Sequence, residues 1–158
     1  MKHISYASIE KAIQVIDNLD DVQLEKLYED YDVAQPELLG YLMSAALEYE
    51  NERLEGLILY YYCLISEAFK QEGLTLGKIT EKEIEEFEQP YSEMLDAFFE
   101  NDDEEILEDF CDQPELTRFI SIEISEEDED GTSLDDDTAT QLFIVSIAMI
   151  CLMAKVAQ

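Results

Sequence analysis

The chain has 158 residues, of which 47% are apolar, and its 40 acidic and nine basic residues leave a formal net charge of −31. This length suits one domain, and the apolar content is too high for a disordered acidic chain. So few basic residues exclude direct binding to nucleic-acid phosphates, and the charge disfavours anionic membrane surfaces. We therefore expect a single domain over residues 1–158 and a basic protein as partner, with solubility alone as the other explanation of the charge.

The N-terminal stretch "MKHISYASIEKAIQVI" lacks the apolar region and the cleavage site of a secretion signal, which predicts a cytoplasmic protein. Its apolar residues Ile9, Ile13 and Ile16 recur at helical spacing. The same spacing continues through residues 24–31 and 38–46. The first part of the chain is therefore predicted to be a series of amphipathic helices.

Several residues predict where helices begin and end. Pro36 suits the first position of a helix, and Gly73 is expected to end the long helix before it. Thr80 and Glu83 have the spacing of two residues that cap a helix start reciprocally. Pro90 should either kink the helix that follows or divide it in two.

The assignment of residues 117–124 stays open between helix and strand. Their apolar residues alternate as in a short strand and also fit a helix. Because a single strand cannot stand alone, the fold class predicted for the whole chain is all-α. We expect a bundle of about seven or eight helices.

The two halves of the chain resemble each other, which predicts a tandem duplication of residues 1–79 and 80–158. The "QPEL" at residues 35–38 recurs at residues 113–116, and the "CL" at residues 63–64 recurs at residues 151–152. The first pair is offset by 113 − 35 = 78 residues and the second by 151 − 63 = 88. About ten residues therefore enter the second half, and the acidic stretch "SEEDEDGTSLDDD" at residues 125–137 is this insertion.

The acidic stretch has the spacing of a calcium-binding loop. Oxygen ligands at its first, third, fifth and twelfth positions would come from Glu126, Asp128, Asp130 and Asp137, with Gly131 at the turn. The pattern departs from that motif because Glu replaces the first Asp and Asp replaces the last Glu. A divalent-cation or small-ligand sensor is therefore the alternative function that the sequence offers.

No catalytic residues and no cofactor are predicted, so the sequence does not indicate an enzyme. His3 is the single histidine, and Cys63, Cys111 and Cys151 lie in apolar or acidic surroundings that do not favour a reactive thiolate. We expect all three cysteines to be core thiols without a disulfide. The uncharged run at residues 138–154 is expected to be a buried central helix and not a membrane span.

The predicted function is that of an acidic helical interaction or regulatory module, of the kind found in inhibitors, immunity proteins and nucleic-acid mimics. The second half carries most of the charge, and its helix at residues 100–112 is the best candidate face for a basic partner, while a solvated amphipathic helix is the other and simpler explanation of the same residues. The candidate partner-binding residues are Asp102, Asp103, Glu104, Glu105, Glu108 and Asp109. The oligomeric state does not follow from the sequence.

The charge also yields a prediction about stability. The folded state gathers 40 acidic residues into a small volume, and salt screens their mutual repulsion. We expect the melting temperature, followed by circular dichroism, to rise between 10 mM and 300 mM NaCl. A flat or falling curve would contradict self-repulsion as a major destabilising factor.

Overall fold

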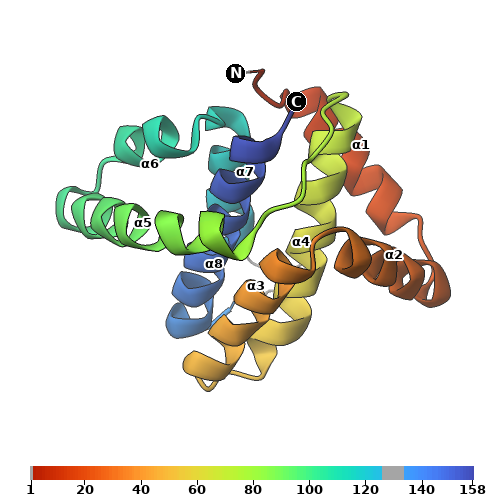
Figure 1. Ribbon diagram of the computed structural model, residues 1–158, viewed down its shortest axis with the longest axis horizontal. Coiled ribbons are helices and arrows are strands. Elements are labelled where there is room, and N and C mark those ends of the chain that lie inside the picture. The colour runs from red at the N-terminus through yellow and green to blue at the C-terminus, as the bar shows by residue number, and fades with distance from the viewer. Residues whose placement is uncertain (1, 126–133) are drawn as a thin grey trace.

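The computed structural model describes residues 2–125 and 134–158, which form eight helices and no strand (Figure 1). The helices are α1 (Tyr6–Asp17), α2 (Asp21–Ala34), α3 (Pro36–Glu48), α4 (Arg53–Gln71), α5 (Glu81–Asn101), α6 (Glu104–Cys111), α7 (Pro114–Ser125) and α8 (Asp136–Val156). The prediction of an all-α bundle of about seven or eight helices is therefore confirmed.

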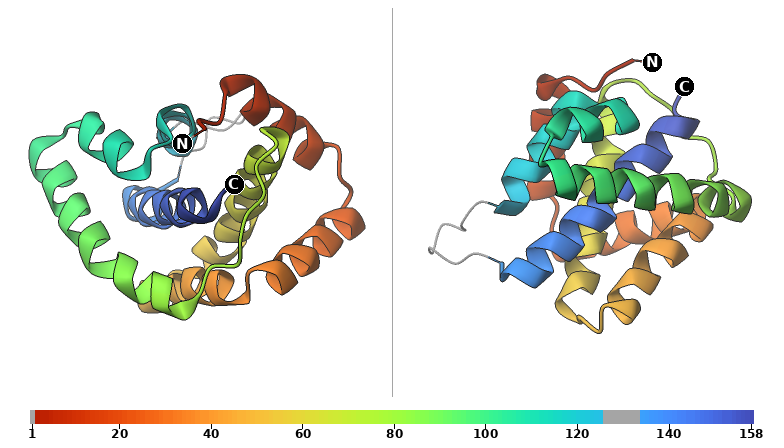
Figure 2. Two further views of the ribbon diagram at one scale, coloured as in Figure 1. Left: turned by 45° about the horizontal axis from the view of Figure 1, so that its top comes forward. Right: turned by 90° about the vertical axis from the view of Figure 1, so that its left-hand side faces the viewer.

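Two helices, α4 and α8, pack against each other at the centre of the bundle. Every residue is buried from Tyr61 to Phe69 in α4 and from Val145 to Ala154 in α8. A helix buried over more than two consecutive turns must be covered on all its faces. The other helices supply that cover, and Figure 2 shows α8 enclosed among them.

The covering helices contact the central pair and also cross between the two halves of the chain. Helix α1 packs on α4 and also meets α7, while α3 packs on α4 and also meets α5 and α8. Helices α5, α6 and α7 all contact α8. Elements from the first half therefore lie directly beside elements from the second.

The predicted helix boundaries are found where they were expected. Helix α3 starts at Pro36, and Gly73 follows the end of α4 with a positive φ of 81°. At the start of α5 the Glu83 amide donates to the Thr80 hydroxyl (3.2 Å), and the Thr80 amide donates to the Glu83 carboxylate (3.2 Å). Such residues predict helix ends well because they suit the backbone groups at a helix end that have no hydrogen-bond partner within the helix.

Two open alternatives are decided by the fold. Helix α5 continues through Pro90 and is not divided there, and Pro90 lies at an exposed position of the helix. Residues 117–124 belong to α7, in which Ile120 and Ile124 are buried at helical spacing while Ile122 is half exposed. A helix leaves no strand edge unpaired, so it is the more favourable state.

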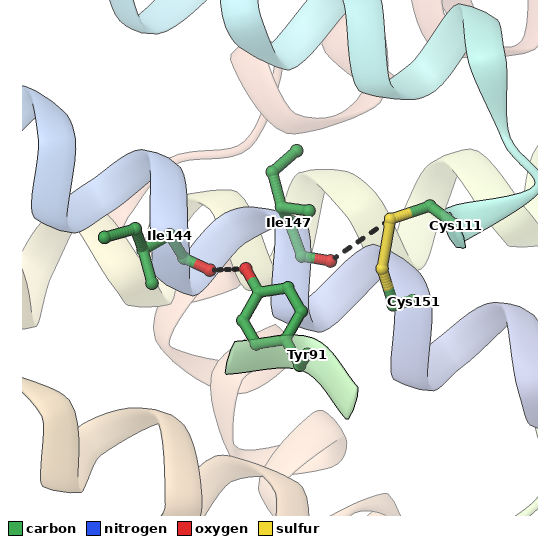
Figure 3. Close-up of a disulfide and its surroundings, with 5 residues drawn as sticks. All are labelled: Tyr91, Cys111, Ile144, Ile147 and Cys151. Carbon is green, nitrogen blue, oxygen red and sulfur yellow. Dashed lines mark hydrogen bonds between the residues drawn. A yellow bond between two sulfur atoms is a disulfide. The ribbon is translucent and has the colours of Figure 1, made fainter. Parts of the chain in front are cut away.

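The expectation that all three cysteines are free was wrong. Cys111 at the end of α6 and Cys151 in α8 form a disulfide, with their Cα atoms 4.6 Å apart (Figure 3). Cys63 is a buried free thiol. The pairing could not be predicted from the sequence, because the two cysteines are 40 residues apart and only the packing of α6 on α8 brings their sulfurs together. Such bonds are rare in reducing compartments, and the cytoplasmic location stays a prediction.

Helix α8 contains the uncharged run of the sequence. In the described parts of the chain it is the one helix that is long and apolar enough to cross a membrane by length and composition. Within its most apolar window, 61% of the residues are buried by the rest of the protein. The core helix of a soluble protein passes the same test, so this feature is weak evidence for a span.

The extended segment before α5 is held by a buried side chain, Gln35. The Gln35 amide group donates to the Gly77 carbonyl (2.8 Å) and accepts from the Ile79 amide (2.8 Å). On its other edge this segment pairs with the chain end, because the Thr75 amide and the Gln158 carbonyl are 2.9 Å apart. Gln35 thus satisfies two backbone groups beside the fully buried Ile79.

Gln113 makes the equivalent contacts with the segment before α1. Its amide group donates to the Lys2 carbonyl (3.0 Å) and accepts from the Ile4 amide (2.8 Å). Each glutamine therefore belongs to one half of the chain and holds the segment that leads into the other half. This reciprocity agrees with what a duplicated chain would have, although the duplication itself stays a prediction.

We expect Gln113→Ala to destabilise the protein strongly. Gln113 is fully buried, and its loss leaves a backbone donor and a backbone acceptor unsatisfied, which costs about 2–4 kcal/mol in total. The free energy of unfolding from urea titration measures this loss. Gln89→Ala, at an exposed position of α5, is the control and should change that free energy by less than about 0.5 kcal/mol. Equal effects of both variants would contradict the role of Gln113.

Candidate functional site

Helices α3 and α5 line a groove, and α8 lines one part of it with Ile144, Val145 and Ala148. The groove consists of two cavities, of about 330 Å³ and about 400 Å³, that share Tyr41 and Glu88. We call it the acidic groove. Its polar and aromatic lining is Glu37, Tyr41, Ser44 and Glu48 from α3, Tyr49 directly after α3, and Glu81, Glu85, Glu88 and Tyr91 from α5. Among the described residues, no Lys, Arg or His lines either cavity.

The groove residues share one face of each helix because of their spacing. On α3, Tyr41 follows Glu37 by four residues, and Glu48 follows Tyr41 by seven. On α5, Glu85 follows Glu81 by four residues, and Glu88 follows Glu85 by three. Residues at these separations lie above one another on a helix. Helix α5 therefore presents a row of three carboxylates to the groove, and α3 presents two, Glu37 and Glu48, with Tyr41 between them.

The five groove glutamates are not neutralised by any cation of the described chain. Ion pairs in the described ranges join His3 to Asp112, Lys26 to Asp30, Arg53 to Asp135, Lys82 to Glu86 and Arg118 to Glu108. None of them includes a groove glutamate. The acidic groove is thus a concave surface with uncompensated negative charge, which attracts cations.

Three tyrosines surround the first cavity at different depths. Tyr91 is buried, and its hydroxyl donates to the Ile144 carbonyl of α8 (Figure 3), whereas Tyr49 is 39% exposed at the end of α3. Burial, followed by Glu88 and Glu48, raises the pKa of Tyr41. Both carboxylates therefore act on the same phenol, although they come from different helices.

An aromatic stack connects this cavity to a cation of the protein. The rings of Phe87 and Tyr91 are stacked with their centroids 4.7 Å apart, and the Lys155 ammonium lies 5.0 Å from the centre of the Phe87 ring. The pKa of Tyr91 is raised well above its ordinary value by burial and then by Tyr41 and Tyr49. The three hydroxyls of the cavity are consequently protonated at neutral pH. The Tyr91 hydroxyl already donates to the Ile144 carbonyl, which leaves those of Tyr41 and Tyr49 as the donors that a ligand can use.

A second polar cluster surrounds Glu67, a buried residue of α4. Glu67 is only 4% exposed, and it accepts hydrogen bonds from the Tyr31 hydroxyl (3.1 Å) and the Gln71 amide (2.9 Å). Burial, followed by Glu67, raises the pKa of Cys63 to about 12. Cys63 is therefore a neutral thiol at physiological pH and a poor nucleophile.

The predicted partner-binding residues lie between the end of α5 and the middle of α6. They are Asp102, Asp103, Glu104, Glu105, Glu108 and Asp109. Asp102 ends α5 with a positive φ of 50°, Asp103 accepts from the Glu105 amide as the cap of α6, and Glu108 pairs with Arg118 (3.1 Å). Three of the six therefore already have structural roles, and whether these residues bind a partner stays a prediction.

Of the four predicted metal ligands, Asp137 alone lies within the described residues, where it is exposed in the first turn of α8. Glu126, Asp128 and Asp130 lie outside the described residues. Within residues 2–125 and 134–158, no group of three or more His, Cys, Asp or Glu side chains could hold a metal ion. The calcium-like site therefore stays a prediction.

The comparisons with known proteins identify no relative: the chain matches no family model, no curated protein and no solved structure.

The acidic groove was not predicted from the sequence. Its signal was present as the rows of glutamate on α3 and α5, but α3 and α5 are brought together only by packing of the two halves.

The buried tyrosines predict that stability falls at alkaline pH. An unfolded chain releases the Tyr91 proton near the ordinary pKa of about 10, whereas the folded protein retains it. The neutral Tyr91 hydroxyl therefore contributes its full stabilisation below pH 10. Above pH 10 the free energy of unfolding falls by about 1.4 kcal/mol per pH unit for this one proton. Urea unfolding of wild type and Tyr91→Phe between pH 9 and 11, in 0.5 M NaCl, measures this slope. Identical slopes would contradict the assignment.

Proposed function

We propose that this protein is an interaction module that binds a basic segment of a partner protein in the acidic groove. The observation that carries the proposal is a concave surface with five glutamates, three tyrosines and no neutralising cation among the described residues. Uncompensated charge is costly for stability, so its concentration in a groove is better explained by a ligand than by solubility. Within this class, the module would act as an inhibitor, an immunity protein or a nucleic-acid mimic towards its basic partner.

Charge and aromatic surface would contribute differently to such binding. The net charge of −31 attracts a basic partner from a distance and raises the association rate. Affinity depends more on a few well-packed anchors, for which tyrosine is one of the preferred residues. The acidic groove offers both features in one place, which supports it over the carboxylates of α6.

The groove and α6 can be compared by removing the same charge from each. We expect Glu85→Gln with Glu88→Gln to weaken binding of the peptide Ac-(Arg-Lys)4-NH2 about tenfold, a loss of about 1.4 kcal/mol. Glu104→Gln with Glu105→Gln changes the net charge equally on α6 and should weaken it less than about twofold. Calorimetry in 50 mM NaCl with the full chain measures both. Equal losses would contradict the groove as the binding site.

A second pair of variants tests the same site by filling it. Gly40 lines the groove, and a Cβ added there meets no atom within 4 Å, so Gly40→Arg places a cation in the groove without disturbing the helix. Gly56 has equally free space on α4 and does not line the groove, so Gly56→Arg is the matched control. Gly40→Arg should abolish peptide binding, and Gly56→Arg should retain it.

A further inference from the structure

The tyrosine cavity of the acidic groove has a more specific chemistry than negative charge alone. This cavity is the one of about 330 Å³ that Tyr41, Tyr49, Tyr91, Glu48 and Glu88 surround. Its floor is apolar and is formed by α8. A ligand that fits must therefore combine positive charge with a surface that packs against rings and aliphatic groups.

We propose that the tyrosine cavity receives an arginine side chain of the basic partner, an inference that rests on the function proposed above. Glu48 on α3 and Glu88 on α5 offer carboxylates from opposite walls of the cavity. A guanidinium has donors on several edges of one plane, so it can bond to carboxylates and hydroxyls together. A lysine ammonium concentrates its charge at one point and cannot span the walls in this way.

The tyrosine rings favour the same ligand. Tyr49 lines the cavity and is 39% exposed, so part of its side chain is open to contact with a planar cation. Stacking of a guanidinium on an aromatic ring adds a favourable interaction that an ammonium makes less often. The neighbouring Phe87 already faces the Lys155 ammonium at 5.0 Å, so a cation over the aromatic residues of α5 is compatible with this fold.

The rest of the groove indicates that the arginine belongs to a polypeptide and is not a free small molecule. Beyond Tyr41 and Glu88 the second cavity adds about 400 Å³ and three further glutamates, Glu37, Glu81 and Glu85. One side chain cannot occupy both cavities. A basic segment that places an arginine in the tyrosine cavity would continue along the carboxylates of α3 and α5, where its other cations meet complementary charge.

Two peptides of equal charge test the selectivity for arginine. We expect the full chain to bind Ac-(Gly-Arg)4-NH2 about tenfold more tightly than Ac-(Gly-Lys)4-NH2 in calorimetry at 50 mM NaCl. Equal affinities would overturn the arginine inference and leave the proposed function intact. Binding of neither peptide would contradict both.

Variants of Tyr49 identify the origin of the selectivity. Tyr49→Leu removes the ring and should abolish the preference for arginine with little change in the affinity for the lysine peptide. Tyr49→Phe retains the ring and should retain the preference. Tyr49 is partly exposed, so both variants are expected to fold, which melting curves verify. An unchanged preference in Tyr49→Leu would overturn the role of this ring.

Agmatine distinguishes a polypeptide from a free small molecule as the source of the guanidinium. It carries this group without a peptide backbone, and we expect it to bind at least tenfold more weakly than the arginine peptide. Binding of agmatine as tight as that of the peptide would overturn the inference of a protein partner and would assign the cavity to a small cation.

Discussion

The structure depends on the contact between α4 and α8. Both helices are buried on every face over at least two turns, from Tyr61 to Phe69 and from Val145 to Ala154. A pair of this kind must be surrounded by other helices, and the chain contributes six of them within its described residues. The buried stretches of α4 and α8 contain one acidic residue, Glu67, so the centre of the fold leaves the other acidic residues of the described chain to the outer helices, the connections and the ends of the central pair.

Two buried glutamines connect the halves of the chain around this centre. Gln35 in the first half holds the segment that leads into α5, and Gln113 in the second half holds the segment that leads into α1. Irregular backbone is costly to bury unless its polar groups are paired. The glutamine contacts therefore anchor each connection where it buries one isoleucine, Ile79 or Ile4, and they join each half to the other at positions that the sequence repeat had already marked.

The function proposed for the acidic groove follows from this arrangement. Helix α3 of the first half and α5 of the second half meet over α8, and their glutamate rows then face one groove. Some carboxylates elsewhere on the surface cap helices or form ion pairs, as Asp103 and Glu108 do. The groove combines charge, aromatic rings and depth, and these three properties distinguish a binding site from a merely solvated face.

The sequence by itself determined the helical class, the cap at Thr80, the start of α3 at Pro36 and the burial of most of residues 138–154, because these depend on local hydrogen bonds and on apolar periodicity. It did not determine the pairing of Cys111 with Cys151 or the meeting of Tyr41 with Glu88 and Tyr91. These contacts join residues that are distant in the chain, and their formation depends on how the helices of the two halves pack around α4 and α8. Only the tertiary structure decided them, since local periodicity specifies which face of a helix is buried and not which helix covers it.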